Sequence, residues 1–298
     1  MFSINRSPYK VGVLTLLLIV GLTLLVGCDN REDTPGIRQP EIVPGFLIIT
    51  GSGVESETRF TLDELKNMEE GLAGACYSAV NNWPAQKFFV GKGVKVSYLL
   101  KKAGIKDEAQ TIIVWAGDGY SAAFTREQLE EKRFCFPNLR EDSEEGAREV
   151  PAILAWEHWE GSSDLSKAAS GKLGLFLGQK GLNDAVTPVY VKDVVTLEVL
   201  SSPPGQWDVV QAEPAPGKVK SGTQVVLTHP QLDQVKIYYT VDGSTPDEKS
   251  RVYNPSTTYF QPDLIQPITI NESMIIKTRV MGFGKYDSPE AAFAYEVE

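Results

Sequence analysis

A proline-rich stretch divides the chain into two parts whose sequence patterns require different folds. Pro203 and Pro204 are followed by Pro214 and Pro216, and each proline removes a backbone hydrogen-bond donor and fixes φ. With 298 residues, the chain is long enough for two domains of ordinary size. We therefore expect a linker, or a first edge strand, over residues 203–217, between a domain at 45–202 and a second domain at 218–298.

The first of these parts mixes strand-like and helix-like periods. Short β-rich runs occur at 45–51, 111–117 and, as a closing strand, 189–200. Apolar residues follow helical spacing at 61–68, 96–104 and 125–134. Strands that alternate with short helices predict an α+β or mixed α/β domain.

Two of the expected helices begin with a capping signal. Thr61 is followed three residues later by Glu64, and Thr125 is followed at the same spacing by Gln128. In this arrangement the threonine hydroxyl and the acidic or amide side chain each satisfy a backbone N–H of the first turn. We therefore expect helices to start at these two threonines.

Two glycines mark expected turns. Gly93 is expected to permit a turn into the helix at 96–104, which would bury Leu99 and Leu100. Asp118 and Gly119 form a dipeptide typical of a hairpin turn between two strands.

The part after residue 205 consists of short strand-like runs separated by Gly, Pro, Asp and Asn. These runs are TQVVLTH, VKIYYTV, PITI, MIIKTRVM and AAFAYEV. Several short strands with regular turn signals and no long helical stretch predict a small all-β sandwich.

The N-terminus has the features of a secretory signal. Arg6 and Lys10 precede an uncharged apolar run of roughly 17 residues, which is short for a membrane span. The segment from Leu25 to Cys28 resembles the lipobox of bacterial lipoproteins, in which the cysteine is lipidated and becomes the mature N-terminus. The resemblance implies a signal peptide at 1–27, lipidation of Cys28, a tether at 28–44, and an extracytoplasmic protein held on the cell membrane by lipid.

Charge and cysteine content exclude several classes of function. Residues 1–27 carry two basic and no acidic residues, so the mature chain has 27 basic and 39 acidic residues, a net charge of −12. This charge argues against binding to nucleic acid or to anionic lipid through a basic face. Besides Cys28, only Cys76 and Cys135 remain, which are enough for one disulfide but not for a zinc site. The sequence leaves open whether these two cysteines meet in space.

Most of residues 45–200 resembles the oxidoreductase molybdopterin-binding domain, which has the sulfite-oxidase type of fold. The resemblance rests on FTLDELKNM, GKGVKVSYLLKKAGI, VWAGDGYSAAFTREQL, VPAILAWEHWEG and YVKDVVTLEVL. It implies a pterin whose molybdenum is bound by one cysteine, for which Cys76 is the candidate. Lys92 and Lys172 are then the basic candidates for holding the cofactor.

Three departures from the family pattern favour a domain without the cofactor. Cys76 is followed by Tyr77 and Ser78 rather than by the family's C-x-x-x-W pattern. Gly174 stands where the family has an arginine that helps hold the cofactor. The signal region NRSPYK has one arginine, whereas molybdopterin enzymes are exported folded by a twin-arginine route. Three interpretations of Cys76 remain: a small strand residue, a partner of Cys135 in a disulfide, or a metal ligand.

Residues 218–298 resemble the Fn3-like C-terminal domain of chitobiase and β-hexosaminidase. The marker is the segment from Tyr238 to Pro246, YYTVDGSTP, followed by the closing strands in SMIIKTRVMGFGKYDSPEAAFAYEV. The resemblance implies an immunoglobulin-like or Fn3-like sandwich without catalytic residues of its own.

Together these features predict a lipid-anchored envelope protein that acts in binding or adhesion, through cell-wall polysaccharide or an envelope protein. The alternative is an exported molybdopterin-dependent oxidoreductase. A structural cell-wall module would rest on the second domain alone.

Overall fold

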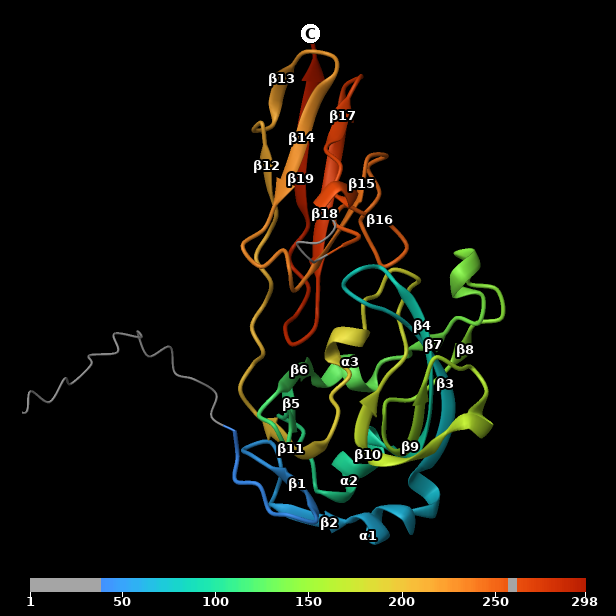
Figure 1. Cartoon of the computed structure of the whole chain (residues 1–298). Coiled ribbons are helices and arrows are strands. Elements are labelled where there is room, and N and C mark those ends of the chain that lie inside the picture. Colours follow the sequence, from blue (N-terminus) through green and yellow to red (C-terminus); the bar gives the residue numbers. More distant parts are fainter. Residues whose placement is uncertain (1–38, 257–261) are drawn as a thin grey trace, which may run out of the picture. The chain divides into compact units, whose positions relative to one another are not determined.

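Two β-sheets form the first part of the chain in a computed structural model that describes residues 39–256 and 262–298 (Figure 1). The expected signal peptide at 1–27, the expected lipidation site Cys28 and most of the expected tether at 28–44 lie outside the described residues. The residues from Gln39 to Glu298 make up one compact unit.

The first sheet has the strand order β2-β1-β11-β5-β6. These strands span Thr58–Thr61, Phe46–Thr50, Val194–Leu200, Thr111–Ala116 and Ser121–Thr125. β11, expected as a closing strand, lies in the middle of the sheet, parallel to β1 and antiparallel to β5. The predicted hairpin is confirmed, since Gly119 adopts φ +92° between β5 and β6.

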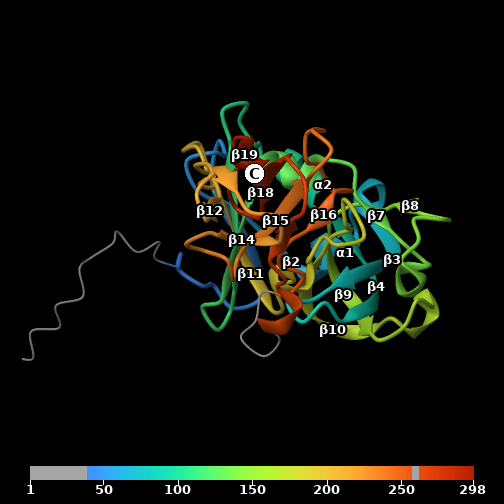
Figure 2. The ribbon, with the colours of Figure 1, turned by 90° about the horizontal axis from the view of Figure 1, so that it is seen from above.

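The second sheet is antiparallel and has the order β10-β9-β4-β3 (Figures 1 and 2). Its strands span Ala169–Phe176, Ile153–Glu160, Gln86–Lys95 and Leu72–Val80. The short strands β7 (Phe134–Cys135) and β8 (Arg148–Glu149) form a separate two-stranded ladder.

All three predicted helices are present among the described residues, but each is shorter than predicted. They are α1 (Leu62–Lys66), α2 (Val96–Lys102) and α3 (Arg126–Glu130), with 3-10 turns at Glu69–Gly71, Leu139–Glu141, Leu165–Lys167, Thr187–Val189 and Pro262–Leu264. Both predicted capping boxes are present, at Thr61 and at Thr125. The helix predicted over 125–134 nevertheless ends at Glu130, because Glu131 is extended and Arg133 is buried among its own polar partners. The described residues are therefore mostly β, with few helices.

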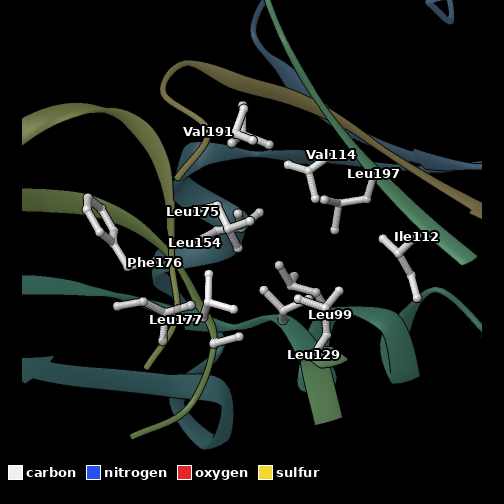
Figure 3. Packing of buried hydrophobic residues seen from close by; sticks show 14 of the residues in the cluster. Leu99, Ile112, Val114, Leu129, Leu154, Leu175, Phe176, Leu177, Val191 and Leu197 are labelled. Atoms are coloured by element: carbon white, nitrogen blue, oxygen red, sulfur yellow. The ribbon is translucent and has the colours of Figure 1, made fainter. Parts of the chain in front are cut away.

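One apolar core lies between the two sheets and the short helices. Figure 3 shows side chains from β5, β9, β10, β11, α2 and α3 directed toward this core. The core-facing side chains in the figure include Leu99, Ile112, Leu129, Leu154, Leu175 and Leu197. Burial of Leu99 and Leu100 on α2, expected from the sequence, is confirmed.

Gly93 acts differently from the sequence prediction. It does not make a turn but lies inside β4, at a register shift opposite β9. A Cβ at Gly93 would lie 1.9 Å from the carbonyl oxygen of Leu154. The glycine is therefore needed because two strand backbones approach each other too closely for any side chain.

The second part of the chain contains two further sheets over a separate apolar core. The three-stranded sheet has the order β12-β14-β17, with bounds Gln211–Glu213, Thr223–Thr228 and Ile268–Ile270. The five-stranded sheet has the order β13-β19-β18-β15-β16, with bounds Gly217–Val219, Ala291–Val297, Met274–Met281, Lys236–Thr240 and Arg251–Val252. Each strand-like run predicted after residue 205 contains one of these strands. The predicted β-sandwich-type domain is present.

The stretch 203–217, expected to be a linker, is in part structured. β12 pairs with β14, and β13 begins at Gly217 and pairs with β19. Trp207 and Val210 are buried in the sandwich core. The expectation of a first edge strand describes the region of β12 and β13 better than that of a free linker. Pro214 and Pro216 lie between these two strands, where no ladder hydrogen bond needs the N–H that proline lacks.

The role of Gly93 gives a test of this packing. Gly93→Ala should destabilise the protein by about 3 kcal/mol or more, because the new methyl group meets rigid backbone rather than a movable side chain. Gly74→Ala on β3 is the matched control, since its nearest atoms are side-chain carbons of Leu165 and Lys92 at 3.3 Å. Urea unfolding of both variants checks this, and an equal small loss in both would contradict the close-approach interpretation.

Candidate functional site

Cys76 lies in the middle of β3, next to a second thiol. In the register of the second sheet it lies opposite Val90 of β4. Its Sγ is 3.6 Å from the Sγ of Cys135 on β7, although 58 residues separate them in the sequence. Cys76 is partly exposed, Cys135 is buried, and the two are not bonded in this structure. Cys76 is therefore a strand residue, as one interpretation left open by the sequence has it, and it lies beside Cys135 without the disulfide that a second interpretation requires.

Backbone and polar contacts on both sides of Cys135 hold it in this position. Ser78, two residues after Cys76, accepts a hydrogen bond from the Phe136 N–H at 2.8 Å. The Ser78 hydroxyl donates to Gln179 Oε1 at 2.7 Å, and Gln179 exchanges two backbone hydrogen bonds with Phe134. Both chain neighbours of Cys135 are thus fixed, so the proximity of the sulfur atoms follows from the fold.

The two thiols share their ionisation. The pKa of Cys135 is lowered to about 7, first because Cys76 hydrogen-bonds to its thiolate and then through Ser78 and the charge of Arg148. The pKa of Cys76 is raised, first by its hydrogen bond with Cys135 and then by burial. One proton leaves the pair readily and the second is held.

The two candidate lysines are paired with carboxylates. Lys92 lies on β4, diagonal to Cys76, and its Nζ is 3.5 Å from Glu157 of β9. Lys172 lies on β10, forms an ion pair with Asp193, and is separated from the strand of Cys76 by β9 and β4. The structure therefore brings Lys92 near Cys76 and leaves Lys172 at the other side of the sheet.

These residues do not fit a molybdopterin site. The thiol that would bind the metal faces another thiol, and each lysine that would meet a phosphate already has a carboxylate partner. Over 39–256 and 262–298, no group of three or more His, Cys, Asp or Glu side chains is arranged to hold a metal ion. Cys76 as a metal ligand stays a prediction drawn from the family resemblance.

A different site, which the sequence interpretation missed, is a cavity of about 570 Å³. We call it the α3 cavity, because α3 and the segments around it line one side and the 281–287 segment and β15 line the other. Its charged lining includes Glu131, Arg133, Asp184, Lys236 and Asp287. Its size is within the range typical of small-ligand sites, roughly 300–1,000 Å³.

Gln128 joins the two sides of the α3 cavity. Its Oε1 accepts the Thr125 N–H in the capping box and also the N–H of Gly284 at 3.0 Å. Its Nε2 donates to the Gly282 carbonyl oxygen at 2.9 Å. Phe283, between these glycines, packs edge-on against Phe124, with ring centroids 5.6 Å apart. A capping residue of the first part thus also anchors the β18–β19 connection.

A buried charge network forms one wall of the α3 cavity. Arg133, whose side chain is 4% exposed, contacts Glu131 at 2.6 Å and Asp184 at 2.8 Å. Lys180 adds a second cation 3.2 Å from Glu131. Burial raises the pKa of Asp287, which also lines the cavity. Carboxylates and cations are both present, so the cavity offers hydrogen-bond acceptors and donors to a polar ligand.

Two buried nitrogen groups complete the α3 cavity. Lys236 donates to the carbonyl oxygens of Asn254 at 3.0 Å and Pro255 at 2.5 Å, and burial lowers its pKa to about 8. Trp207 is 5% exposed, and its Nε1–H is a buried donor without a hydrogen-bond partner among the described residues. Such a group is costly to leave unpaired, and it lies beside Gly282, another residue of the cavity lining.

The sequence carries no local signal for this cavity. Its lining comes from segments around residues 82, 120–133, 180–189, 207, 233–248 and 281–287. Each charged residue there looks like an ordinary surface charge in its own segment.

Lys236, which lines the α3 cavity, makes the stability of the protein depend on pH. Between pH 8 and about 10.4 the unfolded lysine is protonated and the folded one is not, so the free energy of unfolding should rise with pH by up to about 3 kcal/mol. Asp184 opposes the shift but does not reverse it. In Lys236→Met this contribution is absent, so urea unfolding at pH 7 and pH 10 should show the wild type gaining stability relative to the variant. A difference that does not change with pH would contradict the burial of a titrating lysine.

Comparison with known proteins identifies the second part of the chain. Residues 214–292 match the chitobiase/beta-hexosaminidase C-terminal domain family. This range agrees with the resemblance seen in the sequence at 218–298 and begins between β12 and β13. No curated protein matches the chain.

One solved structure similar to the chain is the sulfane dehydrogenase SoxCD from Paracoccus pantotrophus. The match has 14% identity and a TM-score of 0.34, and covers 85% of this chain and 71% of that chain. At these values the likeness is distant and establishes neither the fold nor an activity. No helix among residues 39–256 and 262–298 is long and apolar enough to cross a membrane.

Proposed function

We propose that this chain is a lipid-anchored protein of the bacterial envelope that binds cell-surface polysaccharide, with a cofactor-free sulfite-oxidase-type first domain. Its second domain is of the immunoglobulin-like or Fn3-like kind. The observation that carries the proposal is the α3 cavity, with its unpaired Trp207 Nε1–H and its buried carboxylates.

The chemistry of this cavity suits a sugar better than a charged cofactor. A saccharide presents hydroxyl groups that both donate and accept, and the cavity contains acceptors such as Asp287 and Asp184 and the donor of Trp207. Tyr286 and Tyr238 add aromatic surface. The match of residues 214–292 to a chitobiase-type domain is consistent with a polysaccharide ligand.

The region around Cys76 supports a domain without molybdopterin. Cys76 contacts Cys135, and Lys92 and Lys172 are occupied by carboxylates. The rival proposal, an exported molybdopterin-dependent oxidoreductase, requires this region to rearrange around the cofactor. An envelope protein as the bound partner is a further alternative, which the test below separates from polysaccharide.

Sugar binding can be tested with Trp207→Phe, which keeps an aromatic ring but removes the Nε1–H. Affinity of the purified full chain for chito-oligosaccharides or peptidoglycan fragments, measured by calorimetry, should fall about 3- to 10-fold, the value of one hydrogen bond. Trp159→Phe is the matched control, because Trp159 is 54% exposed and does not line the cavity. Equal losses in both variants, or no binding of either saccharide by the wild type, would contradict the proposal. Stoichiometric molybdenum in protein from its native host, lost in Cys76→Ala, would instead establish the rival enzyme.

Lipid anchoring has its own test. Cys28→Ser should abolish labelling by a radioactive fatty acid and leave unprocessed precursor, because the lipid is attached through the cysteine sulfur. Cys76→Ser is the control and should be labelled like the wild type. Unchanged labelling of Cys28→Ser would contradict the lipoprotein assignment without bearing on sugar binding.

A further inference from the structure

The Cys76–Cys135 pair has a geometry that a structural role alone does not require. The sulfur atoms are 3.6 Å apart, whereas a disulfide needs about 2.05 Å, so closure requires a movement of only about 1.5 Å. The segment that carries Cys135 is held against β3 independently of the thiols, by the bonds from Ser78 to Phe136 and to Gln179. The reduced pair is therefore kept in a position from which the bond can form and break without unfolding.

The two thiols differ in their access to solvent. Cys76 is partly exposed on β3, whereas Cys135 is 5% exposed. An external thiol or disulfide can reach Cys76 but not Cys135. This difference assigns the two sulfur atoms to distinct steps of an exchange reaction.

We propose that Cys76 and Cys135 are a reversible dithiol–disulfide pair, in which Cys76 exchanges with an external disulfide and Cys135 resolves the product. The oxidant is a disulfide, either a small molecule such as glutathione disulfide or a protein disulfide oxidant. Cys135, the thiolate of the reduced pair, accepts the Cys76 proton as Cys76 Sγ attacks one sulfur of the external disulfide, and the released thiolate then takes that proton from Cys135. Cys135 thiolate then attacks Cys76 Sγ, closes the intramolecular disulfide and releases the second thiolate.

Atoms and electrons balance in this sequence. The two protein sulfur atoms lose two electrons and two protons, and the external disulfide gains both to become two thiols. In the reverse direction an external thiolate attacks the accessible Cys76 Sγ, and Cys135 leaves as the thiolate. A second external thiolate then attacks the external sulfur of the mixed disulfide, which frees Cys76 and forms the external disulfide again. The proposal needs no metal and is independent of sugar binding.

The bond would act as a clamp on the segment of residues 131–150. This segment contains β7, β8 and the 3-10 turn Leu139–Glu141, and it covers Val80 of β3 through Phe136 and Leu139. When the disulfide forms, it joins this segment covalently to the second sheet. When the disulfide is reduced, the hydrogen bonds of Ser78 remain, so the segment is held less tightly but stays folded.

The test compares trapping of glutathione in the full chain and in two single variants. After exposure to glutathione disulfide, peptide mapping by mass spectrometry should find wild-type Cys76 and Cys135 joined to each other. Cys135→Ser should retain glutathione on Cys76, because the resolving thiol is absent. Cys76→Ser should react at least about 10-fold more slowly at Cys135, because that thiol is buried. Because peptide mapping assigns each modification to one cysteine, any modification of Cys28 is recorded separately from those of Cys76 and Cys135.

A second measurement covers the case in which a variant fails to fold. The wild type equilibrated with reduced or with oxidised dithiothreitol should show melting temperatures that differ by about 5–15 °C, and circular dichroism should show both forms folded. Ser78→Ala, which keeps both thiols but removes the bonds that position Cys135, should close the disulfide more slowly. Wild-type protein that stops at the mixed disulfide, keeps both thiols free, or reacts equally fast at Cys76 and Cys135 would overturn the proposal.

Discussion

The contact of β4 with β9 at Gly93 fixes the geometry of the first part of the molecule. β4 is paired on both edges, with β3 on one side and β9 on the other, so its register decides which residues of the second sheet become neighbours. At Gly93 the backbones approach so closely that a single methyl group would collide with the Leu154 carbonyl. The register shift at this point places Lys92 opposite Glu157, while β3 presents Cys76 toward β7.

The side chains near Cys76 that the sequence resemblance singles out have protein partners of their own. A cysteine that binds a metal must direct its thiolate to the metal, and a lysine that binds a phosphate must direct its ammonium group to it. Here the thiol has a thiol neighbour and the lysines have carboxylate neighbours. The same residue types that the family resemblance singles out are thus present but satisfied by one another, which favours thiol exchange over metal binding.

The α3 cavity depends on side chains that serve two purposes. Gln128 caps α3 and holds the glycines on either side of Phe283, and Arg133 ends the helical stretch while it neutralises Glu131 and Asp184. Buried charges of this kind are tolerated only when each is paired or hydrogen-bonded. Among the residues that line the cavity, only Trp207 has a buried side-chain polar atom without a hydrogen-bond partner, its Nε1–H, and for that reason we propose that the ligand binds there.

The sequence by itself determined the elements whose cause is local. The capping boxes at Thr61 and Thr125, the hairpin at Gly119 and the short strands of the sandwich depend on neighbouring residues, and all are present. The sequence predicted the second domain at 218–298, close to the matched range 214–292, because its short strands separated by turn residues form a distinctive pattern. Tertiary structure alone decided the role of Gly93, the early end of α3, the pairing within 203–217, the meeting of Cys76 with Cys135 and the α3 cavity. Each of these depends on residues that are distant in the sequence, and a contact between distant residues leaves no periodic pattern in either segment. Both candidate sites arise from such contacts, so the sequence singled out Cys76 but neither its contact with Cys135 nor the α3 cavity.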